Sequence, residues 1–452
     1  MLIIPANSAS AAGGFDVANS LRINQGDSAY LHKTFGTSSD RKKWTYSFWI
    51  KKASQTDMGV IAQGADGNNK GLAYFNAAGD FVYFEAASGS VVFLIQTNDL
   101  YRDNLAWYHF VIRVDTTQGT AANRVRLYVN GTQITTFQNA SYPDQNYQGE
   151  INKSDTRHDI SGFNAFGENG YYFDGYMAEV VFTDGQSLAP TDFGEFDSDS
   201  NIWKPIKVSG LTFGTNGFYL DFKASGNLGN DANGGTDLTE VNLAATDQST
   251  DTCTTNFSTL NPLGGSLPLA TFSDGNLTLA STTTTYQSAI GTIAIPTTGN
   301  WYWEYKVLQT TNGSSGEGFI GAALESSYNA SSNPQKLDAD GIVIELSGVS
   351  GGSNFDAGDI ASVEVDRTNN TLKIFKNGSS TASLTKTSLP NEIIFSHVTC
   401  FGSGTASVSA NFGSPPYAIS SGNQDGNGYG NFEYAVPSGY FSLNTKNLAE
   451  YG

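Results

Sequence analysis

The 452-residue chain carries 24 basic and 43 acidic residues, which gives a formal net charge of −19. No Lys/Arg cluster interrupts this acidic surface, which repels phosphate groups, so nucleic acid and anionic membranes are excluded as expected partners. Fifty glycines, 28 Phe and 22 Tyr, with only 3 Met, favour short strands and tight turns over helices, and predict an all-β fold of two or three domains.

Residues 1–14 are expected to form an N-terminal arm. The sequence MLIIPANSASAAGG has a short apolar stretch that ends at proline and no basic region before it, so it lacks the pattern of a secretory signal. The longest apolar runs, such as VVFLI at 91–95, are too short to span a bilayer. We therefore expect no membrane insertion.

Residues 15–222 predict a β-sandwich. WTYSFWIKK alternates as the two faces of one strand do. One face carries Trp44, Tyr46, Phe48 and Ile50, and the other carries Thr45, Ser47, Trp49 and Lys51. Further alternating runs follow, each bounded by Gly, Asn or Asp, which is typical of sandwich strands. These runs are FVYFEA, VVFLIQT, WYHFVIRVD, VRLYVNGTQI, YYFDGYMAEVVFTDG and GFYLDF.

Residues 223–265 are rich in Gly, Asn, Asp and Thr without periodicity, and predict a polar connector. A second sandwich with a C-terminal extension is expected over 266–452, where WYWEYKV again alternates. A similar sequence motif occurs in both halves of the chain: RLYVNG at 126–131 and LKIFKNG at 372–378. Each ends in Asn-Gly, which supplies the two positive-φ positions of a type I′ turn, so a related hairpin is predicted in each sandwich. The two cysteines, Cys253 and Cys400, fall in different expected domains and indicate no disulfide framework.

The segments WTYSFWIKK, WYHFVIRVD, RLYVNGT and FDGYMAEVVFTDGQSLAPTDFG resemble the laminin-G branch of the concanavalin A-like lectin/glucanase superfamily. WYWEYKV, GEGFIGAAL, DGIVIEL and DIASVEVDRTNNTLKIFKNG resemble a SPRY domain over about 266–415. The stretch from about residue 201 to residue 265, through GTNGFYLDF, LGNDANGG, TDQSTD and NFSTLNPL, and the final FEYAVPSGYFSLNTKNLAEYG are similar to structural proteins of tailed, marine-type phages.

These resemblances imply a non-enzymatic protein of the virion surface, made in the host cytoplasm without a signal peptide. Two roles remain open: recognition of host-surface glycans, as in a fibre component, or structural contacts as a decoration or assembly protein of capsid or tail. The expected partners are other virion proteins, further copies of the chain and host-surface glycans.

A glycoside hydrolase is the third and less favoured class, since the superfamily includes retaining glucanases, which need a closely spaced pair of carboxylates. The nearest match is Glu364 with Asp366, but Asn369 stands where a third acid would be, and alternation favours a solvated strand face. None of the histidines lies beside a nucleophile motif, so each is expected to be structural. They are His32, His109, His158 and His397. No catalytic residue and no cofactor is therefore assigned.

Calcium is the one metal that the sequence raises, because laminin-G domains often bind it at the sandwich rim. GNDANGGTD places Asp231, Asn233 and Asp237 in one glycine-rich loop, although such residues more often serve turn geometry.

Aromatic residues are the candidates for sugar binding. Trp44, Trp301 and Trp303 are expected in the cores, whereas Trp49 and Tyr302 face either a ligand surface or a second core layer. Tyrosines in Asn- and Gly-rich loops are typical either of recognition loops or of ordinary surface. They are Tyr142, Tyr147, Tyr171 and Tyr429.

Overall fold

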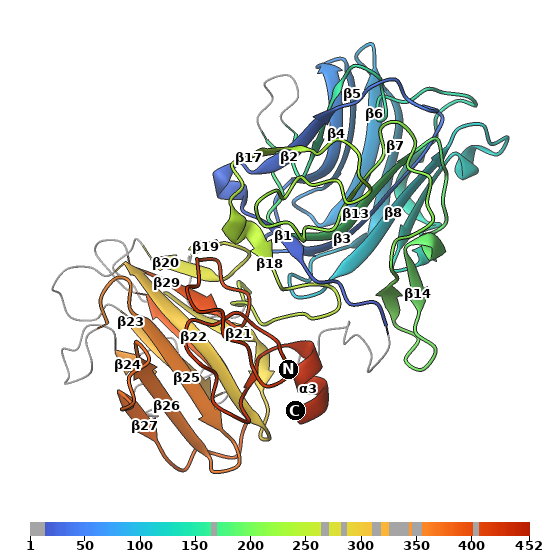
Figure 1. The fold of residues 1–452 in the computed structure, drawn as a ribbon. Coiled ribbons are helices and arrows are strands. Elements are labelled where there is room, and N and C mark those ends of the chain that lie inside the picture. Colours follow the sequence, from blue (N-terminus) through green and yellow to red (C-terminus); the bar gives the residue numbers. More distant parts are fainter. Residues whose placement is uncertain are drawn as a thin grey trace. The chain divides into compact units, whose positions relative to one another are not determined.

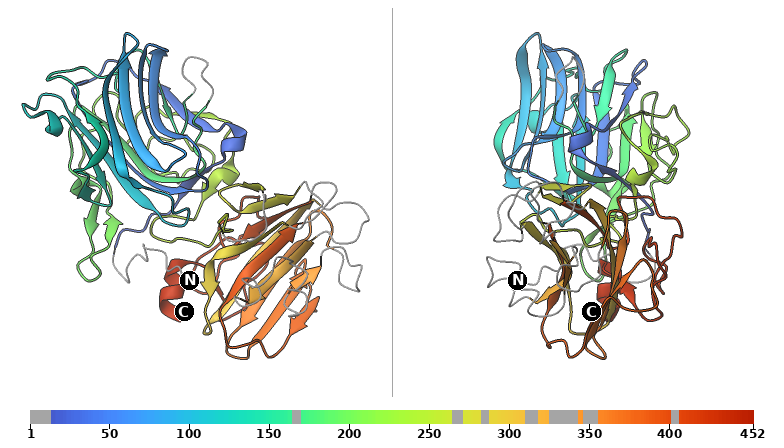
Figure 2. Two further views of the ribbon diagram at one scale, coloured as in Figure 1. Left: turned by 180° about the vertical axis from the view of Figure 1, so that it is seen from behind. Right: turned by 90° about the vertical axis from the view of Figure 1, so that its left-hand side faces the viewer.

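The computed structural model describes residues 14–163, 170–263, 271–281, 287–309, 318–324, 343–345, 355–400 and 406–452. The chain forms two compact units, one of which ends at Thr254 while the other begins at Thr255 (Figures 1 and 2). Each unit is built from two β-sheets, so the prediction of two β-sandwiches is confirmed. The expected N-terminal arm lies outside the described residues except for Gly14. Every helix in the described part of the chain is too short or too polar to span a bilayer.

The first sandwich consists of sheets A and B. Sheet A has the order β10 (Thr132–Gln133), β9 (Val125–Val129), β8 (Tyr108–Asp115), β3 (Lys43–Lys52), β13 (Gly175–Asp184), β1 (Ser20–Ile23) and β18 (Gln248–Ser249), with β16 (Phe218–Leu220) also paired to β13. Sheet B has the order β11 (Phe137–Ser141), β7 (Ser90–Leu100), β6 (Asp80–Ala87), β5 (Asn69–Phe75), β4 (Met58–Asp66), β12 (Arg157–Ile160), β2 (Tyr30–Thr34) and β17 (Thr239–Val241). A short hairpin joins β14 (Gly194–Phe196) and β15 (Trp203–Pro205). The 3₁₀ helices in the described part of this sandwich are η1 (Gln25–Asp27), η2 (Ala121–Asn123), η4 (Pro190–Asp192) and η5 (Ala245–Asp247).

The second sandwich consists of sheets C and D. Sheet C has the order β19 (Thr271–Ser273), β20 (Thr278–Ser281), β29 (Ala406–Asn411), β22 (Asn300–Gln309), β25 (Ile360–Asp366), β26 (Thr371–Lys376) and β27 (Leu384–Lys386), with β30 (Phe441–Ser442) parallel to β22. Sheet D has the order β21 (Gln287–Ile295), β28 (Ile394–Cys400), β23 (Gly318–Leu324) and β24 (Val343–Glu345). One α-helix, α3 (Thr445–Tyr451), follows β30.

Period-two alternation places the predicted faces in the two cores. Trp44, Tyr46, Phe48 and Ile50 of β3 are buried between sheets A and B. In the second sandwich, Trp301 and Trp303 of β22 are buried in the corresponding core together with Tyr305 and Val307. Burial of these large side chains supplies the apolar area that stabilises each unit.

Both Asn-Gly turns adopt the predicted positive φ angles, 47° and 77° at Asn130-Gly131 and 50° and 66° at Asn377-Gly378. The asparagine also reaches the neighbouring strand: Asn130 Oδ1 accepts from the His109 amide at 2.8 Å, and Asn377 Oδ1 accepts from the Ile360 amide at 2.8 Å. The two copies differ after the turn. β10 starts directly after Gly131, whereas β27 starts only at Leu384, so the second copy is a wider hairpin than predicted.

Residues 223–254 belong to the first sandwich, and this corrects the prediction of a connector over 223–265. β17 pairs with β2 and β18 pairs with β1 (Figure 1). The polar side chains of this segment are used for anchoring: Asp251 forms a buried ion pair with Lys51 at 2.7 Å and accepts from Trp107 Nε1 at 3.2 Å. Periodicity is absent because the segment pairs only through strands of two or three residues.

This segment covers the outer face of sheet A. Trp49 lies there, 1% exposed, in a second core layer with Trp107, Trp203 and Cys253. The C-terminal segment covers the outer face of sheet C. There Tyr302 is 1% exposed and makes an edge-to-face contact with Phe432, at 5.1 Å between ring centroids. Of the two alternatives for Trp49 and Tyr302, the second core layer is therefore the observed one.

Candidate functional site

The outer face of sheet B carries an accessible group of aromatic and amide side chains. Phe75, Phe81 and Tyr83 of β5 and β6 point into the core, so alternation turns Tyr74 and Phe84 outward, where both are half-buried. Across the strands, Tyr74 lies opposite Val82, Val82 opposite Gln96 of β7, and Gln96 opposite Asn139 of β11. We call Tyr74, Val82, Phe84, Gln96 and Asn139 the sheet-B platform.

The aromatic part of the platform is held by edge-to-face contacts. Tyr74 lies 6.5 Å from Phe84 and 5.3 Å from Tyr171, measured between ring centroids. Tyr171 also meets Phe163, at 6.2 Å between ring centroids. Such contacts fix the direction of the rings beyond what burial alone achieves. Of the loop tyrosines named from the sequence, Tyr171 is the one that lies beside the platform.

The polar part of the platform is a chain of hydrogen bonds. Asn139 Nδ2 donates to Gln96 Oε1 at 2.7 Å, and Gln96 Nε2 donates to Asp80 Oδ2 at 2.6 Å. Asp80 also accepts from Asn76 Nδ2 at 2.9 Å. Gln96 is diagonal to Phe84 across β6 and β7, and diagonal positions of paired strands are typically about 7–8 Å apart, so long side chains there can meet the same ligand.

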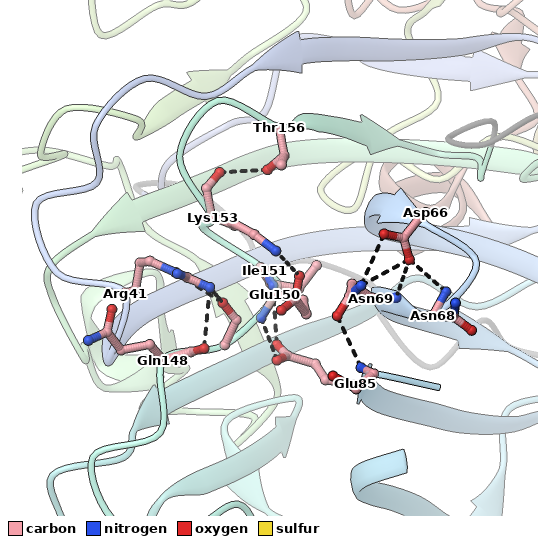
Figure 3. Close-up of polar contacts among 12 residues, drawn as sticks. Arg41, Asp66, Asn68, Asn69, Glu85, Gln148, Glu150, Ile151, Lys153 and Thr156 are labelled. Carbon is pink, nitrogen blue, oxygen red and sulfur yellow. Dashed lines mark hydrogen bonds and ion pairs between the residues drawn. The ribbon is translucent and has the colours of Figure 1, made fainter. Parts of the chain in front are cut away.

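The buried carboxylate of Glu85 stabilises one end of sheet B through hydrogen bonds (Figure 3). It accepts hydrogen bonds from the Tyr83 hydroxyl at 2.6 Å and from the backbone amides of Glu150 at 2.6 Å and Ile151 at 3.3 Å. Burial raises the pKa of Glu85 to about 7. Gly149 allows this approach, since a Cβ at that position would lie 2.8 Å from the Glu85 carboxylate.

The loop that Glu85 holds makes further polar contacts at its surface. Arg41 Nε donates to the Gly149 carbonyl at 3.1 Å, and Lys153 pairs with Glu150 at 2.8 Å (Figure 3). In the adjoining β4–β5 turn, Asp66 accepts from the amides of Asn68 and Asn69 at 2.8 and 2.9 Å. These contacts order the end of sheet B without using the side chains of the platform.

The two acids considered for glycoside hydrolysis, Glu364 and Asp366, make contacts within the fold. Glu364 is half-buried on β25 opposite Lys373, and burial raises its pKa. Asp366 closes the following turn, because it accepts from the Asn369 amide and side chain, each at 2.8 Å. Asn369, at the position of the missing third acid, is thus a turn residue.

Three of the histidines, His109, His158 and His397, are buried, and His32 is half-buried. His109 lies between Ser47 Oγ at 2.8 Å and Trp203 Nε1, which donates to it at 2.9 Å, and burial lowers its pKa to about 3. Ser47 is 1% exposed, so this Ser-His pair does not reach a substrate. Burial also lowers the pKa values of His158 and His397 to about 3, and that of His32 to a smaller extent.

The loop considered for calcium uses its carboxylates to bind its own backbone. Asp231 Oδ1 accepts from the amides of Tyr219 at 2.9 Å and Asn233 at 3.0 Å, and Asp237 accepts from the Asp231 amide at 2.9 Å. Within the described ranges, no group of three or more His, Cys, Asp or Glu side chains is placed to hold a metal ion.

The remaining candidates lie elsewhere. Tyr142 and Tyr147 pack against the core of the first sandwich, and Tyr429 lies under Lys446, whose Nζ is 5.4 Å from the ring centroid. Tyr74, Phe84, Gln96 and Asn139 were not singled out by the sequence. The signal was present in the outward positions of FVYFEA and VVFLIQT, but strand register was needed to bring them together.

Comparison with known proteins agrees with this architecture. Residues 24–190 match the family model described as the concanavalin A-like lectin/glucanases superfamily, in its laminin-G form. No curated protein matches the chain.

Three solved structures illustrate the structural neighbours. The SPRY domain of human HERC1 is 14% identical with a TM-score of 0.27, and the match covers 33% of this chain and 96% of that one. The LG1–3 region of the laminin α2 chain is 11% identical with a TM-score of 0.35, covering 88% and 62%. The CBM40 of the Ruminococcus gnavus IT-sialidase, bound to α2,3 sialyllactose, is 14% identical with a TM-score of 0.26, covering 36% and 93%. Residues 24–190 therefore match a laminin-G-type model of the concanavalin A-like superfamily, and SPRY domains are among the structural neighbours of the chain.

Proposed function

We propose that the chain is a non-enzymatic surface protein of a tailed-phage particle, and that its first sandwich binds host-surface glycans through the sheet-B platform. The phage assignment rests on the resemblance of residues from about 201 to 265 and of the final segment to tailed-phage structural proteins. The binding assignment rests on one observation, the half-buried Phe84 beside the hydrogen-bonded amides of Gln96 and Asn139.

The chemistry of the platform suits a neutral sugar. A pyranose ring presents an apolar face of C–H groups, which packs on an aromatic ring, and a rim of hydroxyls, which exchange hydrogen bonds with amides. Gln96 is already oriented by Asp80 and Asn139, so little side-chain entropy is lost when a sugar binds. We expect a single platform of this size to bind a sugar weakly. Several copies of the chain on one particle would strengthen the binding by avidity.

A glycan array, followed by binding to bacterial cells, tests the proposal. We expect a specific signal for the full chain and its loss in Phe84→Ala. Phe196→Ala is the matched control, because Phe196 is 47% exposed on β14 of the same sandwich. An absence of signal on both glycans and cells, or equal loss in the two variants, would count against the platform.

A decoration or assembly role is the second candidate. It is favoured by two exposed apolar side chains on β7, Val91 at 62% and Leu100 at 44%. Localisation of the chain by electron microscopy of particles separates the roles. A position between capsid or tail subunits supports assembly, whereas a position at a fibre tip supports host recognition.

A further inference from the structure

A cavity of about 360 Å³ lies on the outer face of sheet A, away from the platform on sheet B. Phe218 and Leu220 of β16 point into the core, so alternation places Tyr219 on the outer face, where it lines the cavity. The other walls are residues 207–211 and Phe213, residues 221 and 223, residues 232–233, and Phe15. Its volume is at the lower end of the range for small-ligand sites, about 300–1,000 Å³.

The walls are held in place by hydrogen bonds that involve no ligand. Asp231 Oδ1 accepts from both the Tyr219 amide and the Asn233 amide, and the Ala232 amide donates to the Tyr219 carbonyl at 2.8 Å. On the opposite side, Val208, Leu211 and Phe213 pack with Tyr219 against a cluster of buried apolar residues. The cavity is thus preorganised, which lowers the entropic cost of binding.

Tyr219 lines the cavity, and its hydroxyl keeps acceptor capacity. Its hydroxyl donates to Glu179 Oε2 at 2.5 Å, so the phenol proton is used and the oxygen lone pairs remain. Glu179 is 4% exposed and adopts φ 49° at a bulge in β13, and its other carboxylate oxygen has no partner in the described part of the chain. A strained and incompletely satisfied carboxylate beside a cavity is typical of a binding site rather than of a fold requirement.

The charged side chains that line the cavity are two lysines and one aspartate. Lys223 pairs with Asp221 at 3.1 Å, whereas Lys207 is exposed and makes no ion pair with any described residue. Glu179 and Asp231 lie behind the walls, each less than a twentieth exposed. In a chain with a net charge of −19, Lys207 is therefore a cation available to a ligand.

We propose that this cavity binds one sugar residue that carries a carboxylate. Lys207 pairs with the carboxylate, Tyr219 and the side-chain amide of Asn233 bind ring hydroxyls, and Phe15 and Phe213 pack on the apolar side of the ring. This site goes beyond the proposed function, because it lies on the other sheet and selects an acidic sugar where the platform suits a neutral one.

Titration of the full chain with methyl galacturonide and, separately, with methyl galactoside tests the proposal, by calorimetry or saturation-transfer NMR. We expect the acidic sugar to bind about fivefold more tightly, as one partly exposed ion pair allows, and the difference to shrink at high salt. Lys207→Ala should bring the acidic sugar to the affinity of the neutral one. Tyr219→Phe should weaken both sugars.

Two controls keep the outcome specific. Lys373→Ala removes an exposed lysine of the second sandwich and should leave both affinities unchanged. Phe84→Ala should also retain binding of the acidic sugar, so a failure of the platform and a failure of the cavity are distinguishable. Equal affinity for the two sugars, no binding at millimolar concentration, or retention of the difference in Lys207→Ala would overturn the proposal.

Discussion

Each sandwich anchors a loop with the same arrangement, a tyrosine and a glutamate two residues apart on one strand face. In sheet B, the Tyr83 hydroxyl donates to Glu85, which accepts from the amides of Glu150 and Ile151. In sheet C, the Tyr302 hydroxyl donates to Glu304 at 2.9 Å. Glu304 then accepts from the amides of Glu433 and Tyr434 at 3.0 and 2.8 Å. A buried carboxylate that receives two successive amides thus fixes a distant segment without a regular strand.

The sandwiches differ in how the covering segment is held over the aromatic strand. Over sheet A, the buried carboxylate of Asp251 meets a buried cation, Lys51. Over sheet C, Glu304 meets neutral donors, including Asn411 Nδ2 at 3.2 Å. An ion pair leaves an uncompensated charge when one partner is removed, whereas a carboxylate among neutral donors can be replaced at lower cost. The first sandwich should therefore be the more sensitive to a single substitution in its anchor.

The largest expected effect comes from Asp251→Ala. Lys51 would stay buried without its partner, so the free energy of unfolding of the first sandwich should fall by about 3–5 kcal/mol. Hydrogen exchange of peptides from each sandwich, followed against denaturant, measures this. The second sandwich is the internal control, and Lys51→Met in the same chain should restore part of the loss. A fall below about 1 kcal/mol would remove the proposed difference between the anchors.

The pH dependence gives the next largest effect. Burial raises the pKa of Glu85 from 4.5 to about 7, so this group's contribution to stability is full below about pH 4.5 and is lost as pH rises to about 7. The loss from this one group is roughly 3 kcal/mol at most. Burial also raises the pKa of Glu304. Unfolding midpoints measured across this range should show the slope, and Glu85→Gln should flatten it for the first sandwich.

At constant pH, Glu85→Gln and Glu304→Gln compare the two loop anchors directly. The glutamine side chain has one acceptor oxygen where glutamate has two, so one of the two backbone N–H groups loses its acceptor. The free energy of unfolding of each variant should therefore fall by about 1–3 kcal/mol. Faster hydrogen exchange should appear at residues 147–153 in the first variant and at residues 431–436 in the second. Uniform exchange changes across a whole sandwich would indicate that the carboxylate does not act through its loop.

The smallest effect concerns the repeated Asn-Gly turn. Asn130→Ala and Asn377→Ala each remove one side-chain acceptor and place alanine at positive φ, for an expected loss of about 1–2 kcal/mol. Equilibrium denaturation of the two variants measures it, with Gln138→Ala as a control at an exposed position of β11. Unequal losses would show that the wider hairpin of the second copy makes the turn less important there.

Local patterns predicted the architecture well. Alternation in WTYSFWIKK and WYWEYKV placed Trp44 and Trp301 in the cores, and the two Asn-Gly turns have the expected dihedral angles. The same alternation left Trp49 and Tyr302 undecided, because a strand does not reveal what covers its second face. The candidate platform was not predicted either, since Tyr74, Gln96 and Asn139 lie on three strands whose register the chain order does not state.

Local sequence was enough to predict the strands, their inward faces and the tight turns, because these depend on side-chain alternation and backbone dihedral angles within a few residues. Long-range contacts were needed to place residues 223–254 in the first sandwich, to bring Asp251 to Lys51, and to form the platform and the cavity on opposite sheets. These contacts join residues far apart in the chain, and their stability comes from burial and pairing in three dimensions, which no short stretch of sequence encodes.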